Sequence, residues 1–186
     1  MRQFLAIEVP AAMRDRMGEL QQRLARCTAG FRWVRPESIH LTLRFLGQVP
    51  QPLDADARPA WARAARAGAA FRLQVSELGV FPPRGAPRVL WLGLTELGGE
   101  GGRLERLANA LEQAARDLGF PPQERAFRAH LTLGRARGAA SRPPPDVGWA
   151  VPEPFEVAEV TLFESRLHPA GARYTALARY PLGARR

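Results

Sequence analysis

The stretches His40-Leu41-Thr42-Leu43 and His130-Leu131-Thr132-Leu133 are the same tetrapeptide, in a chain of 186 residues that has only 3 histidines. Side chains in an extended strand alternate between two faces. Each copy therefore places a histidine and a threonine on one face and two leucines on the other. The leucines would anchor the strand in a core, and the polar pair would lie together on one surface.

Two such strands predict chemistry as well as structure. Imidazole has an unperturbed pKa near neutrality, so two facing imidazoles can act as acid and base at neutral pH. One copy alone would be explained by a strand with a polar face. Two copies are harder to explain structurally, because a buried polar group without a partner costs about 1–3 kcal/mol. We expect His40, His130, Thr42 and Thr132 to form the catalytic site.

The order of predicted elements repeats along the chain. Hydrophobic periodicity predicts helices over 11–26, 53–67 and 104–118, and strands over 4–9, 31–34, 39–46, 71–81, 88–95, 127–133, 155–163 and 174–180. Strand, long helix, motif strand and strand follow one another over 4–81 and again over 88–163, with 174–180 as a final strand. This order predicts one bilobal domain over 1–186. Its expected fold class is α+β, with two pseudo-symmetric lobes of antiparallel sheet and outer helices around a central cleft.

The composition limits the possible partners. All 27 basic residues are arginine and the net charge is +9. Guanidinium groups suit phosphate oxygens, but a genomic arginine bias explains the excess charge equally well. Cys27 is the only cysteine, which excludes an intramolecular disulfide and a thiolate zinc cluster and favours a cytoplasmic location. No run approaches the roughly 20 apolar residues of a membrane span, so we expect no membrane association.

Two converging histidines could also bind a metal. Zinc usually requires a third protein ligand, and the sequence contains no His-Glu-x-x-His or Cys-x-x-Cys motif. No Gly-x-Ser-x-Gly motif indicates a serine nucleophile. We therefore expect neither a metal nor an organic cofactor, and we expect the third histidine, His168, to lie on the surface.

Four further residues are candidates for substrate binding. Arg44 follows the first histidine by four positions and would share its strand face, whereas Arg135 lies five positions after the second histidine and would need a bulge or turn to reach the cleft. Either could contact phosphate or remain a solvated charge. Phe45 and Trp33 could stack on a base, although aromatic residues in apolar strands more often belong to the core.

The sequence resembles the 2H phosphoesterase superfamily, and within it the LigT-like RNA 2′,3′-cyclic phosphodiesterases, over nearly its whole length. The resemblance rests on residues 1–10, on Trp33-Val34 before the first motif, on Phe127 before the second, and on Glu164-Ser165, Gly171, Tyr174 and Tyr180-Pro181-Leu182 near the end.

The resemblance implies hydrolysis of an RNA-terminal 2′,3′-cyclic phosphate to a 2′-phosphate without a metal. It also implies that His40 is the proton donor, that His130 is the proton acceptor, and that the reverse joining of RNA through a 2′,5′ linkage can occur. The two threonines would bind the non-bridging phosphate oxygens. RNA ends are then the expected partner, and we expect a monomer.

Two alternatives remain open at this stage. The enzyme could act on small cyclic phosphates such as ADP-ribose 1″,2″-cyclic phosphate, or the chain could be a non-catalytic RNA-binding module. Turnover of cyclic-ended oligonucleotides and of cyclic mononucleotides would distinguish these possibilities.

Overall fold

The computed structural model describes residues 1–49, 54–98, 101–138, 147–168 and 171–184. The helices are α1 (Ala11–Cys27), α2 (Asp54–Arg66) and α3 (Arg103–Asp117), with a short 3-10 turn at Pro36–Ser38. The strands are β1 (Arg2–Glu8), β2 (Phe31–Trp33), β3 (His40–Gln48), β4 (Phe71–Phe81), β5 (Val89–Leu97), β6 (His130–Ala136), β7 (Phe155–Val157), β8 (Glu159–Arg166) and β9 (Arg173–Pro181). The expected α+β class is confirmed.

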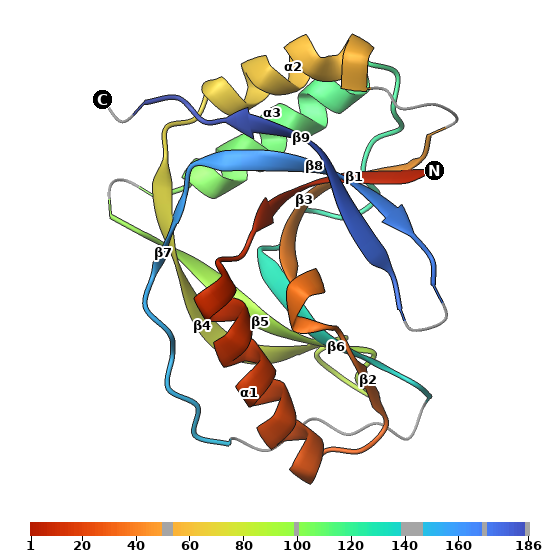
Figure 1. Cartoon of the computed structure of the whole chain (residues 1–186), viewed down its shortest axis with the longest axis vertical. Coiled ribbons are helices and arrows are strands. Elements are labelled where there is room, and N and C mark those ends of the chain that lie inside the picture. Colours follow the sequence, from red (N-terminus) through yellow and green to blue (C-terminus); the bar gives the residue numbers. More distant parts are fainter. Residues whose placement is uncertain (50–53, 99–100, 139–146, 169–170, 185–186) are drawn as a thin grey trace.

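All strand pairs are antiparallel, and they form one curled sheet in the order β7-β4-β5-β6-β3-β1-β8-β9, with β2 paired to β6 (Figure 1). The order has an internal symmetry. Exchanging β3 with β6, β1 with β5, β8 with β4, and β9 with β7 gives the same sequence of neighbours. The symmetry centre lies between β3 and β6, the two strands that carry the repeated tetrapeptide.

The helices cover the sheet at opposite ends (Figure 1). Helix α1 buries one stripe of side chains, and its Gln21 amide donates hydrogen bonds to the carbonyls of Val34 (2.7 Å) and Leu133 (2.8 Å). These bonds fix α1 against β6 and against the residue that follows β2. Helices α2 and α3 pack against each other, and they also contact β9 and β3 respectively. Each half of the sheet is therefore covered by its own helical layer.

One predicted strand is wrong in its extent. The segment 155–163 is not continuous, because it breaks at Ala158 into β7 and β8. Strand β7 pairs with β4, whereas β8 pairs with β1 on the other side of the symmetry centre. The chain thus crosses from one half of the sheet to the other within this segment. Hydrophobic alternation alone does not reveal a change of neighbours, because both pieces are buried strands.

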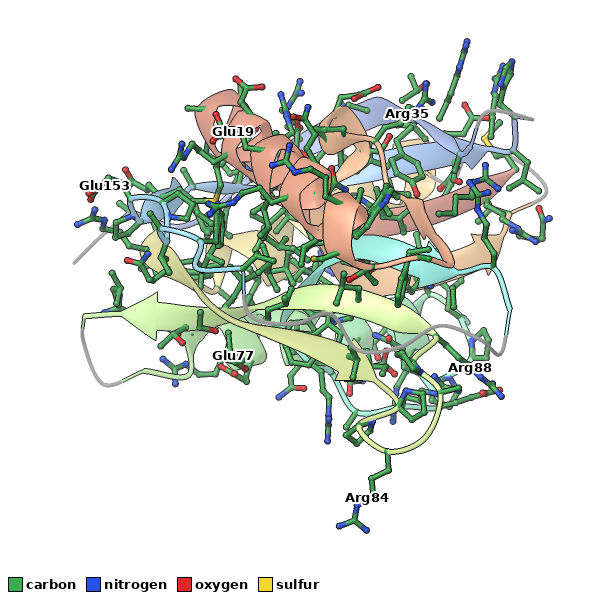
Figure 2. All side chains as sticks on the ribbon, turned by 90° about the horizontal axis from the view of Figure 1, so that it is seen from below. Glu19, Arg35, Glu77, Arg84, Arg88 and Glu153 are labelled. Carbon is green, nitrogen blue, oxygen red and sulfur yellow. The ribbon has the colours of Figure 1, made fainter. Side chains whose placement is uncertain are left out.

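The other boundaries differ by a few residues. The second motif strand begins at His130, because residues 127–129 do not pair. Helix α2 begins at Asp54, and residue 53 lies outside the described ranges. None of the helices in the described ranges has the length and apolar character needed to cross a bilayer. Charged side chains such as Glu19 and Arg84 extend outward in several directions (Figure 2), so net charge alone does not locate a site.

Candidate active site

The site is built on the pairing of the two motif strands. Leu41 of β3 pairs with Leu131 of β6, and both side chains are completely buried in the core. Since neighbouring residues of a strand face opposite ways, the polar residues of both motifs lie together on the other face. These residues are only partly buried, and they are His40, Thr42, His130 and Thr132.

The pairing also sets how the four side chains are arranged. On either side of the leucine pair, antiparallel geometry places His40 beside Thr132 and Thr42 beside His130. The two histidines are therefore diagonal neighbours, which in antiparallel sheets are typically about 7–8 Å apart, with their Cβ atoms somewhat closer. The four polar side chains thus lie next to one another on one face of the sheet.

Both histidines are held in the same way by the backbone. His40 Nδ1 lies 2.8 Å from the carbonyl of Ser38, and His130 Nδ1 lies 2.7 Å from the carbonyl of Arg128. A carbonyl oxygen can only accept, so each Nδ1 carries a proton and donates it. In both rings Nε2 is the nitrogen left to exchange protons. The symmetry of the fold thus extends to the tautomers of the two imidazoles.

His40 lies in an aromatic pocket. Its ring stacks on Phe4 with a centroid distance of 4.7 Å, and it forms a T-shaped contact with Tyr174 at a centroid distance of 5.0 Å. Burial lowers the pKa of His40 to about 4, against the opposing effect of its bond to Ser38, and the charges of Arg135 and His130 lower it further. In the free protein at neutral pH, His40 is therefore a neutral imidazole.

His130 has a different and more open environment. The centroid of its ring lies 5.3 Å from that of Phe81 and 6.5 Å from that of Trp91, and both contacts are T-shaped. The Arg128 guanidinium lies 6.0 Å from the centre of the Phe81 ring, within cation–π range. The two catalytic candidates are thus related by the fold but are chemically unequal.

A β-bulge in β3 decides the position of Arg44. Across β1, Ala6 pairs with Thr42, and the next pair joins Leu5 to Arg44, which leaves Leu43 without a partner. The extra residue shifts the alternation of faces, so Arg44 shares the core face with Leu5. The expectation that Arg44 shares the strand face of the first histidine is therefore wrong.

Arg44 instead forms a buried structural contact with α3. Its Nε lies 2.7 Å from a carboxylate oxygen of Glu112, without the angle of a hydrogen bond. Its terminal nitrogens donate to the carbonyls of Phe45 and Pro121. Burial alone would raise the pKa of Glu112, but hydrogen bonds from Arg116 and Gln123 and the charges of Arg44 and Arg116 hold it below its usual value.

A second bulge, at Leu133 of β6, places Arg135 on the face of the sheet that carries the two motif histidines, called here the histidine face. Trp91 pairs with Thr132, and the next pair joins Leu90 to Gly134, so Leu133 is unmatched. Arg135 then follows on the histidine face, and its positive charge lowers the pKa of His40. The sequence-based condition that Arg135 needs a bulge to reach the cleft is met, while its contact with phosphate remains a prediction.

The aromatic candidates fall on different faces. Phe45 lies two residues after the bulge residue of β3, as Arg135 lies two residues after that of β6. Its side chain is 57% exposed, and its ring centroid lies 5.9 Å from that of Phe4, which stacks on His40. Trp33 instead pairs with Gly134 and packs against the core. A Cβ on Gly134 would lie 3.2 Å from the indole of Trp33. The interpretation of Trp33 as a stacking residue of the cleft is therefore wrong.

The sequence-based interpretation missed Phe4 and Tyr174, which enclose His40 from strands distant in sequence. It also missed Glu8, which pairs with His40 across β1 and β3. Tyr174 lies in a segment that carries the family resemblance, but no local pattern places it near a histidine. Burial raises its pKa, against the charge of Arg135.

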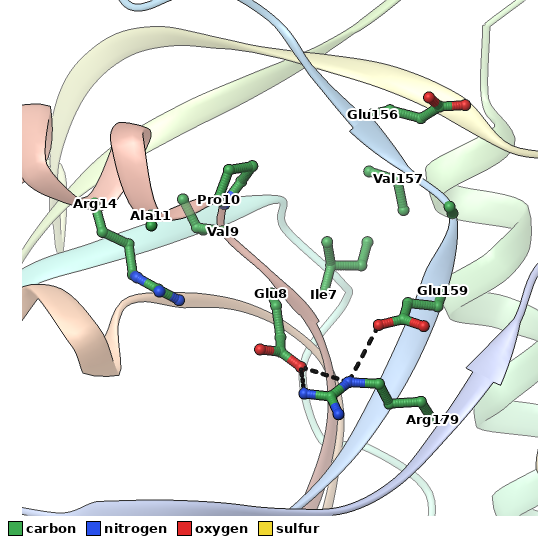
Figure 3. A pocket seen from close by; sticks show the side chains of 11 residues that line it. Ile7, Glu8, Val9, Pro10, Ala11, Arg14, Glu156, Val157, Glu159 and Arg179 are labelled. Carbon is green, nitrogen blue, oxygen red and sulfur yellow. Dashed lines mark hydrogen bonds and ion pairs between the residues drawn. The ribbon is translucent and has the colours of Figure 1, made fainter.

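Two cavities adjoin the His40 side of the site. A cavity of about 240 Å³ is lined by His40, Tyr174 and Glu8 among others, and a larger one of about 540 Å³ continues past Glu8. In the larger cavity Arg179 donates to Glu8 at 3.0 Å and contacts Glu159 at 3.2 Å (Figure 3). Thr161 also donates to Glu8, at 2.9 Å. The charge of Glu8 is thus compensated locally.

The remaining expectations concern His168 and metals. His168 is exposed, as predicted. Within the described part of the chain, no three His, Cys, Asp or Glu side chains are clustered so that they could hold a metal ion.

Comparison with known proteins identifies the family. The family model described as LigT like Phosphoesterase matches residues 7–91 and 98–174. The RNA 2′,3′-cyclic phosphodiesterase of Aeropyrum pernix is 33% identical over 172 residues, which cover 89% of this chain and 94% of that protein.

Two solved structures agree with this match. The crystal structure of TT0787 of Thermus thermophilus has a TM-score of 0.83 at 30% identity and covers 100% of both chains. Escherichia coli LigT complexed with 3′-AMP has a TM-score of 0.73 at 31% identity and covers 97% of both chains. The chain is thus an enzyme of the phosphoesterase class. It belongs to the family of LigT-like phosphoesterases.

Proposed function

We propose that this protein hydrolyses the 2′,3′-cyclic phosphate at the end of an RNA to a 2′-phosphomonoester, by acid–base catalysis with two histidines and without a metal. Its family and the relatives named RNA 2′,3′-cyclic phosphodiesterase support 2′,3′-cyclic phosphodiesterase activity. One observation supports the finer mechanism most directly. Each Nδ1 is bound to a backbone carbonyl and the two histidines lie on paired strands, so both Nε2 atoms would be free to act on one phosphate group.

The reaction begins with in-line attack of water on phosphorus. His130 Nε2 takes a proton from the attacking water as the new P–O bond forms. The bond from phosphorus to the ribose 3′-oxygen breaks, and His40 Nε2 gives its proton to this leaving oxygen. The products are a 2′-phosphate and a free 3′-hydroxyl. The net transfer of one proton from His40 to His130 is reversed through solvent before the next turnover.

The hydroxyls of Thr42 and Thr132 would donate hydrogen bonds to the two non-bridging phosphate oxygens. Donors fixed in advance toward developing charge are a large catalytic contribution, on the order of 3–4 kcal/mol for a well-placed one. Arg135 would add a positive charge on the same face, and the exposed ring of Phe45 would stack on a base.

The low pKa of His40 affects its role as the acid. At neutral pH the free protein holds His40 uncharged, because burial and the charge of Arg135 disfavour the imidazolium. The bound cyclic phosphate is an anion, and it would offset Arg135 and raise the pKa of His40. Substrate binding would thus load the proton that the leaving oxygen requires.

The same site can join RNA ends. A 5′-hydroxyl that takes the place of water would lose its proton to His130 and attack the cyclic phosphate, which yields a 2′,5′ linkage. No additional group is required, because the leaving oxygen again receives its proton from His40.

Leaving-group chemistry tests the two histidine roles. His40→Ala should lower turnover of a cyclic-ended RNA at least a hundredfold, within the usual range for a general acid. The loss should be less than about tenfold on bis(4-nitrophenyl) phosphate, because 4-nitrophenolate departs without a proton. His130→Ala should lower turnover of both substrates at least a hundredfold.

The opposite pattern would show that the two roles are exchanged, and unchanged activity in both variants would refute the two-histidine mechanism.

Wild-type turnover should persist in EDTA, and activity abolished by EDTA and restored by zinc would overturn the metal-free assignment. Phosphorus NMR of the product should show a 2′-phosphate.

A further inference from the structure

The histidine face of the sheet carries two arginines that lie directly opposite each other on paired strands. Arg32 of β2 pairs with Arg135 of β6, so both side chains project from the same face of the sheet. Both residues are exposed. No carboxylate in the described ranges lies within ion-pair distance of either guanidinium. Like charges directly opposite one another destabilise a sheet, so the arrangement is unfavourable without an anion.

The position of Arg32 distinguishes it from Arg135. The charge of Arg135 reaches His40 and Tyr174 strongly enough to affect both pKa values, whereas that of Arg32 affects neither. Arg32 lies on β2, beside the motif strand β6 that carries Arg135 and His130. Strand β2 also lies outside the symmetric order of the sheet, so this arginine has no counterpart in the other half.

The Arg32 side chain lies beside a glycine of the connection between β8 and β9. A Cβ built on Gly171 would lie 3.4 Å from Arg32 Nη2, which is an ordinary contact distance. The guanidinium thus lies against the bare Cα of a glycine. It remains exposed there and can meet a ligand that extends past Arg135.

The cavity that adjoins Glu8 is less favourable for a polyanion. The large cavity beyond Glu8 is lined by three carboxylates, those of Glu8, Glu156 and Glu159, and by two guanidinium groups, those of Arg14 and Arg179. Arg179 is already bound to Glu8 and Glu159 (Figure 3). A nucleotide strand that leaves the histidines would meet net negative charge there and net positive charge on β2 and β6.

We propose that Arg32, with Arg135, forms a second phosphate subsite, which binds the phosphate on the 5′ side of the terminal nucleotide. This inference rests on the proposed function and extends it. The subsite makes the enzyme prefer an RNA end over an isolated cyclic mononucleotide, because the mononucleotide has no second phosphate. Arg32 is a specificity-determining residue, and it does not touch the reacting atoms.

Three substrates, which differ in whether they carry a second phosphate, measure how much that phosphate contributes to kcat/KM. They are adenosine 2′,3′-cyclic phosphate, the same molecule with a 5′-phosphate, and a cyclic-ended dinucleotide. Arg32→Gln should lower kcat/KM about tenfold for the two substrates with a second phosphate, the scale of one charge-assisted hydrogen bond on a surface. The change for the plain mononucleotide should stay within twofold. Arg32→Lys, which keeps the charge, should restore part of the loss.

Arg23→Gln is the matched control, because it removes the same charge from the exposed face of α1. It should leave all three substrates unchanged. The salt dependence of log kcat/KM on the dinucleotide should become shallower by about one unit of slope in Arg32→Gln, and it should not change in Arg23→Gln.

A binding measurement tests the Arg32 subsite independently of the proposed phosphodiesterase activity. By calorimetry, adenosine 2′,5′-bisphosphate should bind the wild type about tenfold more tightly than adenosine 2′-phosphate, and Arg32→Gln should abolish this difference. An equal loss on all substrates, or an unchanged preference for the bisphosphate, would overturn the subsite. Wild-type protein that turns over no cyclic phosphate would refute the proposed function, and the bisphosphate comparison would still decide the role of Arg32.

Discussion

Replacing Arg44 by methionine should destabilise the protein and leave its substrate binding intact. In the sequence Arg44 resembles a phosphate ligand, because it lies four residues beyond His40, the proposed proton donor. The bulge at Leu43 turns it to the core, where it contacts Glu112 and two carbonyl groups. Methionine fills a similar volume without a charge, so the substitution removes the interactions and keeps most of the packing.

The burial of the pair sets the size of the effect. The side chain of Arg44 is 5% exposed and that of Glu112 is 18% exposed. Removing one partner of a buried pair costs about 3–5 kcal/mol, since the other charge is left uncompensated. Glu112 keeps its bonds to Arg116 at 2.9 Å and to the Gln123 amide at 3.2 Å. We therefore expect the lower end of the range, about 3 kcal/mol.

Urea unfolding of the wild type, Arg44→Met, Glu112→Gln and the double variant measures this effect. The double variant should lose less than the sum of the single losses, because neither charge is then left unpaired. In native buffer, KM for a cyclic-ended dinucleotide should stay within twofold of the wild type. A variant that keeps its stability and shows a tenfold higher KM would refute the structural role of Arg44 and restore it as a phosphate ligand.

Two further predictions concern the surroundings of the histidines. Gly79→Ala should lower the free energy of unfolding by about 1–3 kcal/mol, because the new Cβ would lie 2.2 Å from the Trp91 ring. The near-ultraviolet circular dichroism should change as well, and unchanged values of both would contradict the tight packing. In a proton NMR titration, His40 should show a pKa of about 4 that rises in Arg135→Gln. Since the unfolded chain binds this proton near the ordinary histidine pKa of 6.5, stability should fall as pH drops from about 6.5 toward 4, and a pH-independent urea midpoint in that window would contradict the low pKa.

The sequence was sufficient for the features that depend on local periodicity. The shared faces of the histidines and threonines followed from the alternation of side chains in a strand, and the structure places all four on one face. The α+β class followed from the order of helical and extended patterns. These features need no knowledge of which strands are neighbours.

The features that depend on neighbours could not be predicted. A bulge is defined by the partner strand, so nothing in Leu43 or Leu133 itself shows that it lacks a partner. This is why Arg44 was placed on the wrong face. The break at Ala158 has the same origin, because each flanking strand is specified by pairing with a different half of the sheet. The enclosure of His40 by Tyr174 likewise depends on long-range pairing.

Each half of the chain contributes one strand to the other half of the sheet, and this affects whether either half can fold alone. Strand β4 belongs to the first half of the chain but pairs with β5 of the second, whereas β8 belongs to the second half and pairs with β1 of the first. Neither half can complete a sheet from its own residues. We expect fragments cut between β4 and β5 to be unfolded when alone and to regain activity when mixed, so that cleaving one exposed turn yields two mutually dependent polypeptides.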